Sequence, residues 1–462
     1  MRKLLRYTML LFSGILLAQS QGVTPKGGAY DFNPSQIACV TPENYELYRE
    51  QVTKNTKQLV AANKRLYAPN RASQQVAFEW PVAQAEGFDY NSFWSISNYV
   101  DHNDATGQLS DWNCGTRTYD TSGGYDHQGV DIFTWPFTWT MVDNDQALVV
   151  AAAAGQIVYK NDGSYDRNCS FNNDQWNAVF VEHSDGSVAW YGHMKEGSLT
   201  SKNVGDTVAT GETLGVVASS GNSTGPHLHF EVYDAGGNLI DPYAGPCNDT
   251  AATSWWADQK AYTNPGINAV ITHSAPPEFN FNNCPTTEVL NDTKQVDANG
   301  TLVFASYFRD QTIGESADYK VTDPNGNIYT QWSQTFENFY TASYWYWEFA
   351  IDETEGEWIF EVSYADDIVT QTFTVGELSV TEVDGLGLAA FPNPAQHTIT
   401  IQANTVIEQI ALYDIQGRLV QSLTPSSFTK DVDISRLPSG VYFAAITAEQ
   451  GSLQQTIRLI KK

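Results

Sequence analysis

The chain has 462 residues, a formal net charge of −28 and 42% hydrophobic residues. A chain of this length exceeds what a single hydrophobic core supports, and about three domains are expected. Its acidic balance repels nucleic acid and anionic lipid, so we expect no nucleic-acid partner.

Residues 1–20 have the pattern of a secretory signal peptide. Basic side chains at Arg2, Lys3 and Arg6 precede an apolar run, and the small residues Ala18 and Ser20 follow it. The apolar run is too short to cross a bilayer. No later segment is apolar enough to do so, and we expect an exported protein without a transmembrane segment. Its five cysteines then predict disulfides with one thiol left over.

A helix is expected near the amino terminus of the mature chain. Thr41 is a good helix cap, Pro42 suits the first helical position, and the helix is predicted to extend to about Leu66. It belongs to an amino-terminal helical segment, residues 21–77. Both an inhibitory prosegment and a simple packing support fit this segment.

Two short motifs contain residues that are suited to binding a metal ion. His127 and Asp131 are four residues apart, a spacing that returns two side chains to the same side of a strand or a helix. Farther along, His227 and His229 lie two apart at the start of a strand pattern and therefore share one face. Three such donors from two segments can form a catalytic zinc site, which leaves one position open for water. The spacing does not decide which of His227 and His229 binds metal.

Three pieces of the chain resemble the signatures of lysostaphin-like (LytM-type) zinc metallopeptidases. These pieces are residues 127–131, 190–194 and 221–231. The resemblance covers roughly Phe78 to Tyr243 and implies a peptidase domain over residues 78–245, built as an antiparallel β-domain with the site in a groove.

The resemblance also implies the roles of individual residues. His127, Asp131 and His229 would hold one Zn²⁺, while His193 and His227 would act as catalytic histidines beside it. His183 matches no signature and is expected to be an ordinary strand-end residue.

Two further expectations concern this domain. Glu231 shares the face of His229 and could orient a ligand, although an ordinary exposed strand position is the simpler expectation. In the implied fold, the disulfides are expected to join Cys114 to Cys169 and Cys247 to Cys284, which leaves Cys39 as the odd cysteine.

The remaining segments are predicted to be β-rich. A connector, residues 246–286, is followed by an immunoglobulin-like β-sandwich over residues 287–377, inferred from strand alternation and turn spacing. Its aromatic run, residues 344–347, suits either a face that binds polymer substrate or a buried core. Residues 385–462 resemble the carboxy-terminal sorting domain of type IX secretion, a small β-sandwich, which implies the type IX machinery as a partner and an extracellular or cell-surface location after transit through the periplasm.

We therefore expect a mainly β protein that is a secreted zinc metalloendopeptidase. Its substrate would be the peptide cross-links of peptidoglycan or a Gly-rich extracellular protein. The alternative is a catalytically inactive member of the fold that binds cell wall or another polymer.

Overall fold

The computed structural model describes residues 24–32, 38–67, 74–170, 172–279, 288–376, 388–448 and 453–462. The signal peptide expected at residues 1–20 lies outside this set. The chain is mainly β, as expected, and it divides into two compact units, Met1–Gly376 and Glu377–Lys462. Within the described ranges, no helix is both long enough and apolar enough to cross a membrane.

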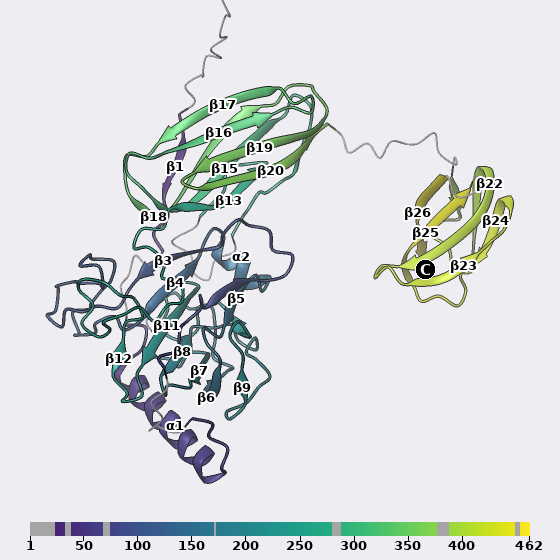
Figure 1. Cartoon of the computed structure of the whole chain (residues 1–462). Helices are drawn as coiled ribbons and strands as arrows, with labels where there is room; N and C mark the ends of the chain where they lie inside the picture. Colours follow the sequence, from purple (N-terminus) through teal and green to yellow (C-terminus); the bar gives the residue numbers. More distant parts are fainter. Residues whose placement is uncertain are drawn as a thin grey trace, which may run out of the picture. The chain divides into compact units, whose positions relative to one another are not determined.

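Two antiparallel sheets form the part of the first unit that contains the predicted site (Figure 1). The central sheet has the order β3-β4-β11-β8-β7-β6-β9, with β12 paired to β11. Its strands are β3 (Trp94–Asn98), β4 (Val130–Thr134), β6 (Gly155–Asn161), β7 (Ala178–Glu182), β8 (Val188–Gly192), β9 (Thr207–Val208), β11 (His227–Tyr233) and β12 (Leu239–Ile240). The smaller sheet, in the order β10-β5-β2, contains β2 (Val82–Gln84), β5 (Ala147–Val150) and β10 (Thr213–Val216).

Side-chain alternation along β11 gives the central sheet two different faces. Leu228, Phe230 and Val232 are fully buried in the apolar core between the two sheets. His229 and Glu231 lie on the opposite face, because alternate residues of a strand point to opposite sides. The polar residues of the site are therefore backed by a packed core.

Helix α1 (Pro42–Ala61) confirms the expected amino-terminal helix. The Thr41 hydroxyl accepts a hydrogen bond of 3.2 Å from the backbone N–H of Asn44 and so caps the first turn. The helix ends at Ala61, short of the predicted limit near Leu66, and the buried Tyr48 ring stacks on Trp176, which precedes β7, at a centroid distance of 5.6 Å. The other helix, α2 (Thr138–Asp143), is a short turn after β4.

The rest of the first unit is a β-sandwich of two sheets around a shared apolar core. One sheet has the order β1-β18-β15-β13, and the other has the order β14-β20-β19-β16-β17. The strands are β1 (Lys26–Ala29), β13 (Gly266–His273), β14 (Gln295–Val296), β15 (Thr301–Gln311), β16 (Ser316–Thr322), β17 (Ile328–Thr335), β18 (Tyr340–Ala350), β19 (Gly356–Tyr364) and β20 (Asp367–Val375). Strand β13 lies within the stretch expected as a connector, and it pairs with β15.

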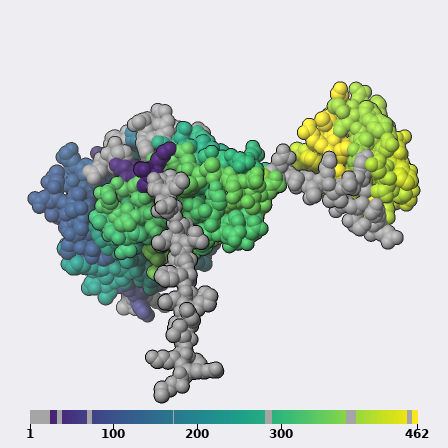
Figure 2. Space-filling model, turned by 90° about the horizontal axis from the view of Figure 1, so that it is seen from above, coloured from purple at the N-terminus to yellow at the C-terminus, as the bar shows by residue number. Residues whose placement is uncertain are grey.

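The amino-terminal strand β1 was not expected, and it completes the sandwich from a distant part of the sequence. It pairs antiparallel with β18, Lys26 opposite Tyr346 and Gly28 opposite Tyr344. Figure 2 shows these purple residues against the green atoms of the sandwich. The aromatic run on β18 is divided between two packing roles. Trp345 and Trp347 contribute to the sandwich core, while Tyr344 and Tyr346 pack against a separate apolar cluster that includes Trp135.

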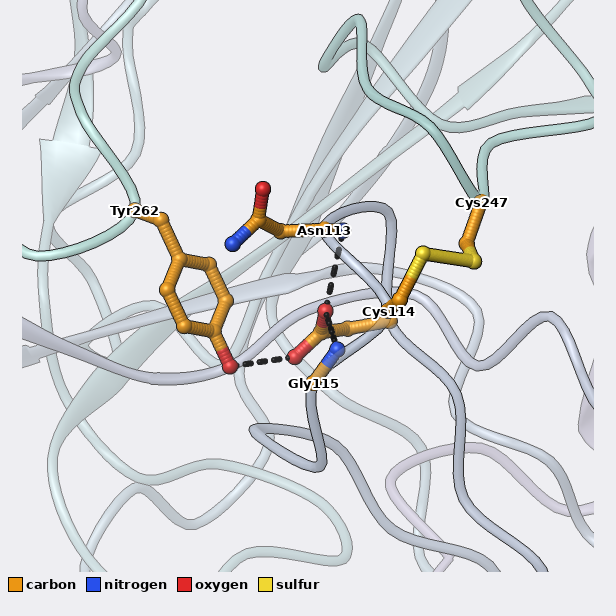
Figure 3. Close-up of a disulfide and its surroundings, with 6 residues drawn as sticks. Asn113, Cys114, Gly115, Cys247 and Tyr262 are labelled. Carbon is orange, nitrogen blue, oxygen red and sulfur yellow. Dashed lines mark hydrogen bonds between the residues drawn. A yellow bond between two sulfur atoms is a disulfide. The ribbon is translucent and has the colours of Figure 1, made fainter.

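The disulfide pairing differs from the expectation. Cys114 is bonded to Cys247, with the two Cα atoms 5.1 Å apart, so neither predicted pair is correct (Figure 3). The backbone N–H of Cys247 donates to the Trp112 carbonyl at 3.0 Å, which shows that the segment after β12 returns beside the Cys114 loop. Cys169 is also disulfide-bonded, and Cys284 lies outside the described residues.

Figure 3 also shows what holds the Cys114 loop. Asp111 accepts hydrogen bonds from the backbone N–H groups of Asn113 and Gly115 at 3.0 and 2.8 Å, and from the Tyr262 hydroxyl at 2.6 Å. One carboxylate therefore supports both the turn at the disulfide and the segment that leads into β13.

The second unit is a small β-sandwich-like module with its own apolar core. Strand β22 is its centre and pairs with β21, β23, β24 and β25, while β26 pairs with β25. The strands are β21 (Ala389–Phe391), β22 (Thr398–Asp414), β23 (Leu419–Leu423), β24 (Ser427–Asp433), β25 (Gly440–Ala448) and β26 (Leu453–Lys461).

Candidate metal centre

The register of three neighbouring strands brings the sequence motifs together. In β11, His229 lies opposite Asp131 of β4 on one side and opposite Gly192 of β8 on the other. His193 directly follows Gly192, and His127 precedes β4 by three residues. All five predicted site residues therefore meet at one place on the central sheet.

Gly129 allows the turn before β4 to approach this place closely. A Cβ atom at residue 129 would lie 2.6 Å from Cε1 of His229 and 3.0 Å from the Phe230 carbonyl oxygen. Any larger residue would therefore displace the His229 ring.

Three of the five residues form one group of donor atoms. Nε2 of His127 lies 3.0 Å from Oδ2 of Asp131, and Nδ1 of His229 lies 2.8 Å from Oδ1 of the same carboxylate. With the thiol of Cys39, these donor atoms all lie within 4.8 Å of one another. The arrangement offers two imidazole nitrogens, one carboxylate oxygen and one sulfur to a common point.

The second nitrogen of each imidazole is held by a neighbouring acceptor. Nδ1 of His127 donates to the Tyr99 carbonyl at 2.7 Å, which leaves Nε2 with its lone pair toward the group. Nε2 of His229 lies 3.3 Å from Oε2 of Glu231, which leaves Nδ1 toward the group. Outer partners of this kind fix the tautomer and orientation of metal-binding histidines.

His193 and His227 form a second pair beside the first group. Their ring centroids are 4.4 Å apart, and their Nδ1 atoms donate to the carbonyls of Ser220 at 2.6 Å and Gly225 at 2.8 Å. Both Nε2 atoms are buried without a hydrogen-bond partner among the described residues. Nε2 of His227 is 3.6 Å from the Asp131 carboxylate, farther than the nitrogens of the first group.

The electrostatics fit a cation. Burial opposes ionisation of Asp131, but the imidazoles of His127 and His227 outweigh it and hold the pKa of this carboxyl well below its usual range. Burial, together with the neighbouring His227, lowers the pKa of His193. Nε2 of His127 is buried, and its 3.0 Å contact with Asp131 does not have the geometry of a hydrogen bond. This nitrogen, an ionised carboxylate and a second oriented imidazole suit Zn²⁺, which takes N, O and S donors.

Glu231 is not the exposed strand residue that the sequence suggested. Only 1% of its surface is accessible, and its carboxylate accepts hydrogen bonds from the hydroxyls of Tyr45 and Tyr233 besides contacting His229. The alternation of side chains along β11 correctly placed Glu231 on the face of His229. The burial of Glu231 depends on packing against α1, and this packing cannot be predicted from the sequence of β11.

The amino-terminal segment covers the site. The sequence left open whether this segment is an inhibitory prosegment or a packing support, and it did not indicate that Cys39 lies at the site. Cys39 is a free cysteine and is buried among the five site residues, and the Phe32 ring lies edge-on to His227 at a centroid distance of 5.4 Å. The odd cysteine count was the one signal that could have drawn attention to Cys39. His183, in contrast, lies apart from the group, and its Nδ1 donates to the Ala154 carbonyl at 3.0 Å.

Comparisons with known proteins identify two regions of the chain. Residues 125–242 match the model of peptidase family M23, and residues 389–462 match that of a secretion system C-terminal sorting domain. The DD-carboxypeptidase/endopeptidase Mpg of Neisseria meningitidis serogroup B is 38% identical over 84 residues, which are 18% of this chain and 16% of that protein. The peptidoglycan DD-endopeptidase ShyC of Vibrio cholerae is 32% identical over 82 residues, 18% of each chain.

The chain thus spans less than a fifth of the length of these curated relatives. Among solved structures, the catalytic domain of a mutant of the prophage-encoded M23 protein EnpA from Enterococcus faecalis is 22% identical with a TM-score of 0.22. That similarity covers 37% of this chain and 96% of the EnpA chain.

Proposed function

We propose that this chain, which carries a peptidase family M23 domain and a secretion system C-terminal sorting domain, is a secreted zinc metalloendopeptidase. The proposal rests mainly on the convergence of His127, Asp131 and His229. The imidazole nitrogens of His127 and His229 lie 3.0 and 2.8 Å from the two oxygens of the Asp131 carboxylate. These three side chains are the proposed ligands of one Zn²⁺.

A zinc ion held there would supply a water acidified toward neutral pH and a Lewis acid for the scissile carbonyl. The chain's own residues then have to move protons and stabilise the developing oxyanion. His193 and His227 are suited to this, because each has its Nδ1 fixed by a carbonyl, which directs Nε2 toward a substrate or a water.

The two histidines differ in their electrostatic surroundings. Burial lowers the pKa of His193, whereas the Asp131 carboxylate outweighs burial and raises the pKa of His227. Both Nε2 atoms are buried without a hydrogen-bond partner among the described residues, and we assign the pair to proton transfer and to hydrogen bonding with the oxyanion.

For the substrate, we favour the peptide cross-links of peptidoglycan. The names of both relatives describe endopeptidases, and one of the names specifies peptidoglycan. A Gly-rich extracellular protein is the other substrate class to be tested. The sorting domain supports export through the type IX machinery, with the enzyme acting outside the cell.

An inactive, polymer-binding member of the fold is the competing hypothesis. Such a protein has no need to keep three metal ligands and two further histidines in one place, and this chain has all five. The presence of all five side chains therefore favours the hypothesis of an active enzyme.

The test combines metal content with hydrolysis. The purified mature chain is assayed by mass spectrometry for zinc, then incubated with peptidoglycan and with a Gly-rich protein, with and without chelator. Limited proteolysis before the assay is included, because the amino-terminal segment covers the site. We expect one zinc per chain and release of peptide fragments that the chelator abolishes. A chain without zinc contradicts the proposal, and so does polymer binding that the chelator does not change.

A further inference from the structure

We infer that Cys39 is a fourth ligand of the same metal, so that the amino-terminal segment holds the peptidase in a latent form. The inference rests on the proposed function, because it requires the metal at this site. It assigns an inhibitory role to a segment for which the sequence left packing support equally open.

The position of the thiol carries the inference. Sγ of Cys39 belongs to the group in which all donor atoms of His127, Asp131 and His229 lie within 4.8 Å of one another. The same sulfur belongs to a second group, in which the donor atoms of Cys39, His193 and His227 also lie within 4.8 Å of one another. The sulfur therefore lies between the proposed ligands and the proposed catalytic histidines, where a catalytic site keeps its open position.

The surroundings of the thiol differ from those of an ordinary buried cysteine. A structural free cysteine packs among apolar side chains as a small hydrophobic residue. Cys39 does pack in an apolar cluster with Val40 and Tyr45, but its sulfur also contacts the Tyr119 hydroxyl at 3.1 Å, and the Tyr119 ring stacks on His127 at a centroid distance of 4.7 Å. A hydroxyl beside a metal-bound thiolate is the kind of outer partner that stabilises the bond.

An unpaired thiol is also unusual in an exported protein, where oxidation is expected. Cys39 is buried and is the free cysteine in the part of the chain that the structure describes. Ligation to zinc would protect the thiolate and give a reason for an odd cysteine at this place.

The chain before Cys39 is anchored to the sandwich. Strand β1 pairs with β18 over four residues, and the Tyr30 N–H donates to the Ala342 carbonyl at 2.8 Å. Phe32 follows, stacked on Phe133 at 4.6 Å and edge-on to His227. These contacts place apolar surface over one of the proposed catalytic histidines.

The chain after Cys39 is anchored to the peptidase sheet by α1. The Tyr45 hydroxyl donates to Glu231 at 3.3 Å, the Asn44 amide donates to the Asp174 carbonyl at 3.2 Å, and the Asn55 amide donates to the Val158 carbonyl at 2.9 Å. With anchors on both sides, Cys39 is brought to the site at low entropic cost.

Closure of the site follows from these contacts. His127, His193 and His229 have no accessible surface, and Asp131 and His227 have 1% and 3%. A site with four protein ligands is closed to water and resembles a structural zinc site. Peptide hydrolysis would then require the Zn–S bond to break, water to enter in its place, and the thiolate to take a proton from solvent.

Cobalt substitution of the full mature chain tests the ligand directly. A thiolate bound to Co²⁺ gives a charge-transfer band in the near ultraviolet, whereas nitrogen and oxygen ligands alone do not. We expect this band in the wild type and in Glu46→Ala, an exposed control on α1, and its loss in Cys39→Ala with one Co²⁺ still bound. Wild-type protein that binds one Co²⁺ without the band overturns the inference and leaves the proposed function intact.

Activity provides the second measurement. We expect zinc-loaded Cys39→Ala to hydrolyse substrate more than about tenfold faster than the wild type, because only the fraction of wild type with the thiolate displaced is competent. If the alanine variant does not fold, Cys39→Ser serves for the same comparison. Equal rates for wild type and variant refute latency, whereas absence of bound metal from every variant refutes the proposed function and this inference together.

Discussion

Tyr45 of α1 donates a hydrogen bond to Oε2 of Glu231, and the same oxygen lies 3.3 Å from Nε2 of His229. One carboxylate thus joins the amino-terminal helix to the ring that we propose as a metal ligand. Docking of the helix and orientation of the ligand are coupled through this atom.

Glu231→Gln tests that coupling. The substitution keeps the shape but removes the negative charge that supports His229, and we expect zinc affinity to fall about 10–100-fold. Competition with a chromophoric chelator measures it. Tyr45→Phe removes only the contact from the helix and should change affinity much less. Equal affinity of Glu231→Gln and wild type would show that Glu231 has only a packing role.

Substitution of four of the five site residues should separate metal binding from turnover. We expect His127→Ala and Asp131→Ala to lose zinc, and His193→Ala and His227→Ala to keep zinc while losing most of the activity. Zinc content by mass spectrometry, measured on variants that remain folded, distinguishes the two classes. His183→Gln is the control, because this buried histidine lies outside the group and should retain both properties. A zinc-free His193→Ala protein would contradict the division.

The Arg117–Asp310 ion pair should dominate the attachment of the sandwich to the peptidase region. Both side chains are buried, at 8% and 6% exposure, and the guanidinium contacts both carboxylate oxygens, at 2.7 and 3.3 Å. Arg117→Met leaves a buried carboxylate unpaired, and we expect a loss of about 3–5 kcal/mol in the free energy of unfolding. Denaturant unfolding measures this loss.

A surface pair provides the matched comparison for that experiment. Lys320 and Glu361 are 2.6 Å apart but 37% and 31% exposed, so Lys320→Met should cost less than about 1 kcal/mol. The double variant Arg117→Met/Asp310→Asn should recover part of the loss. A cost for Arg117→Met as small as that of Lys320→Met would rule out a major role for the buried pair.

His102 should make stability depend on pH. Burial lowers the pKa of His102, but hydrogen bonds to Asp241 and Asp249, each 2.9 Å, outweigh burial and raise the pKa above 6.5. Because the pKa of His102 is raised in the folded state, the stabilisation from its ion pairs is complete below about pH 6. It is lost as the pH rises through the folded-state pKa of His102. His102→Gln should therefore reduce the free energy of unfolding more at pH 6 than at about pH 9. A difference that does not change with pH would contradict the ion pairs.

Removal of the Cys114–Cys247 disulfide should destabilise the first unit. The bond closes a loop with a sequence separation of 133 residues. Cys114→Ser/Cys247→Ser is expected to lose about 2–5 kcal/mol in the free energy of unfolding. Thermal unfolding measures it, and reductant should lower the Tm of the wild type more than that of the double variant, which keeps the disulfide of Cys169. An unchanged Tm would mean that neighbouring contacts, such as those of Asp111, hold the loop without the bond.

Much of the fold and the site followed from local patterns. Alternation placed His229 and Glu231 on one face of a strand, and the Thr41–Pro42 pair marked the start of α1, because both patterns depend on residues close in sequence. The motifs around His127, His193 and His229 were sufficient for the family, since each is a short run of residues.

Contacts between segments that are distant in the sequence could not be predicted from local patterns. The pairing of β1 with β18, the Cys114–Cys247 bond and the burial of Glu231 under α1 each join parts of the chain that no spacing rule connects. The wrong disulfide pairs show the difficulty, because many pairings satisfy the same cysteine count.

By itself, the sequence predicted a group of candidate metal-binding residues and the strands next to or within which they lie, because side-chain chemistry and strand periodicity are local properties. Only the tertiary structure decided that the thiol of Cys39 lies among those residues and that the amino-terminal segment covers them. The physical reason is that the position of Cys39 depends on two remote anchors, the edge of β18 and the outer face of the central sheet, which come together only when the whole unit has folded.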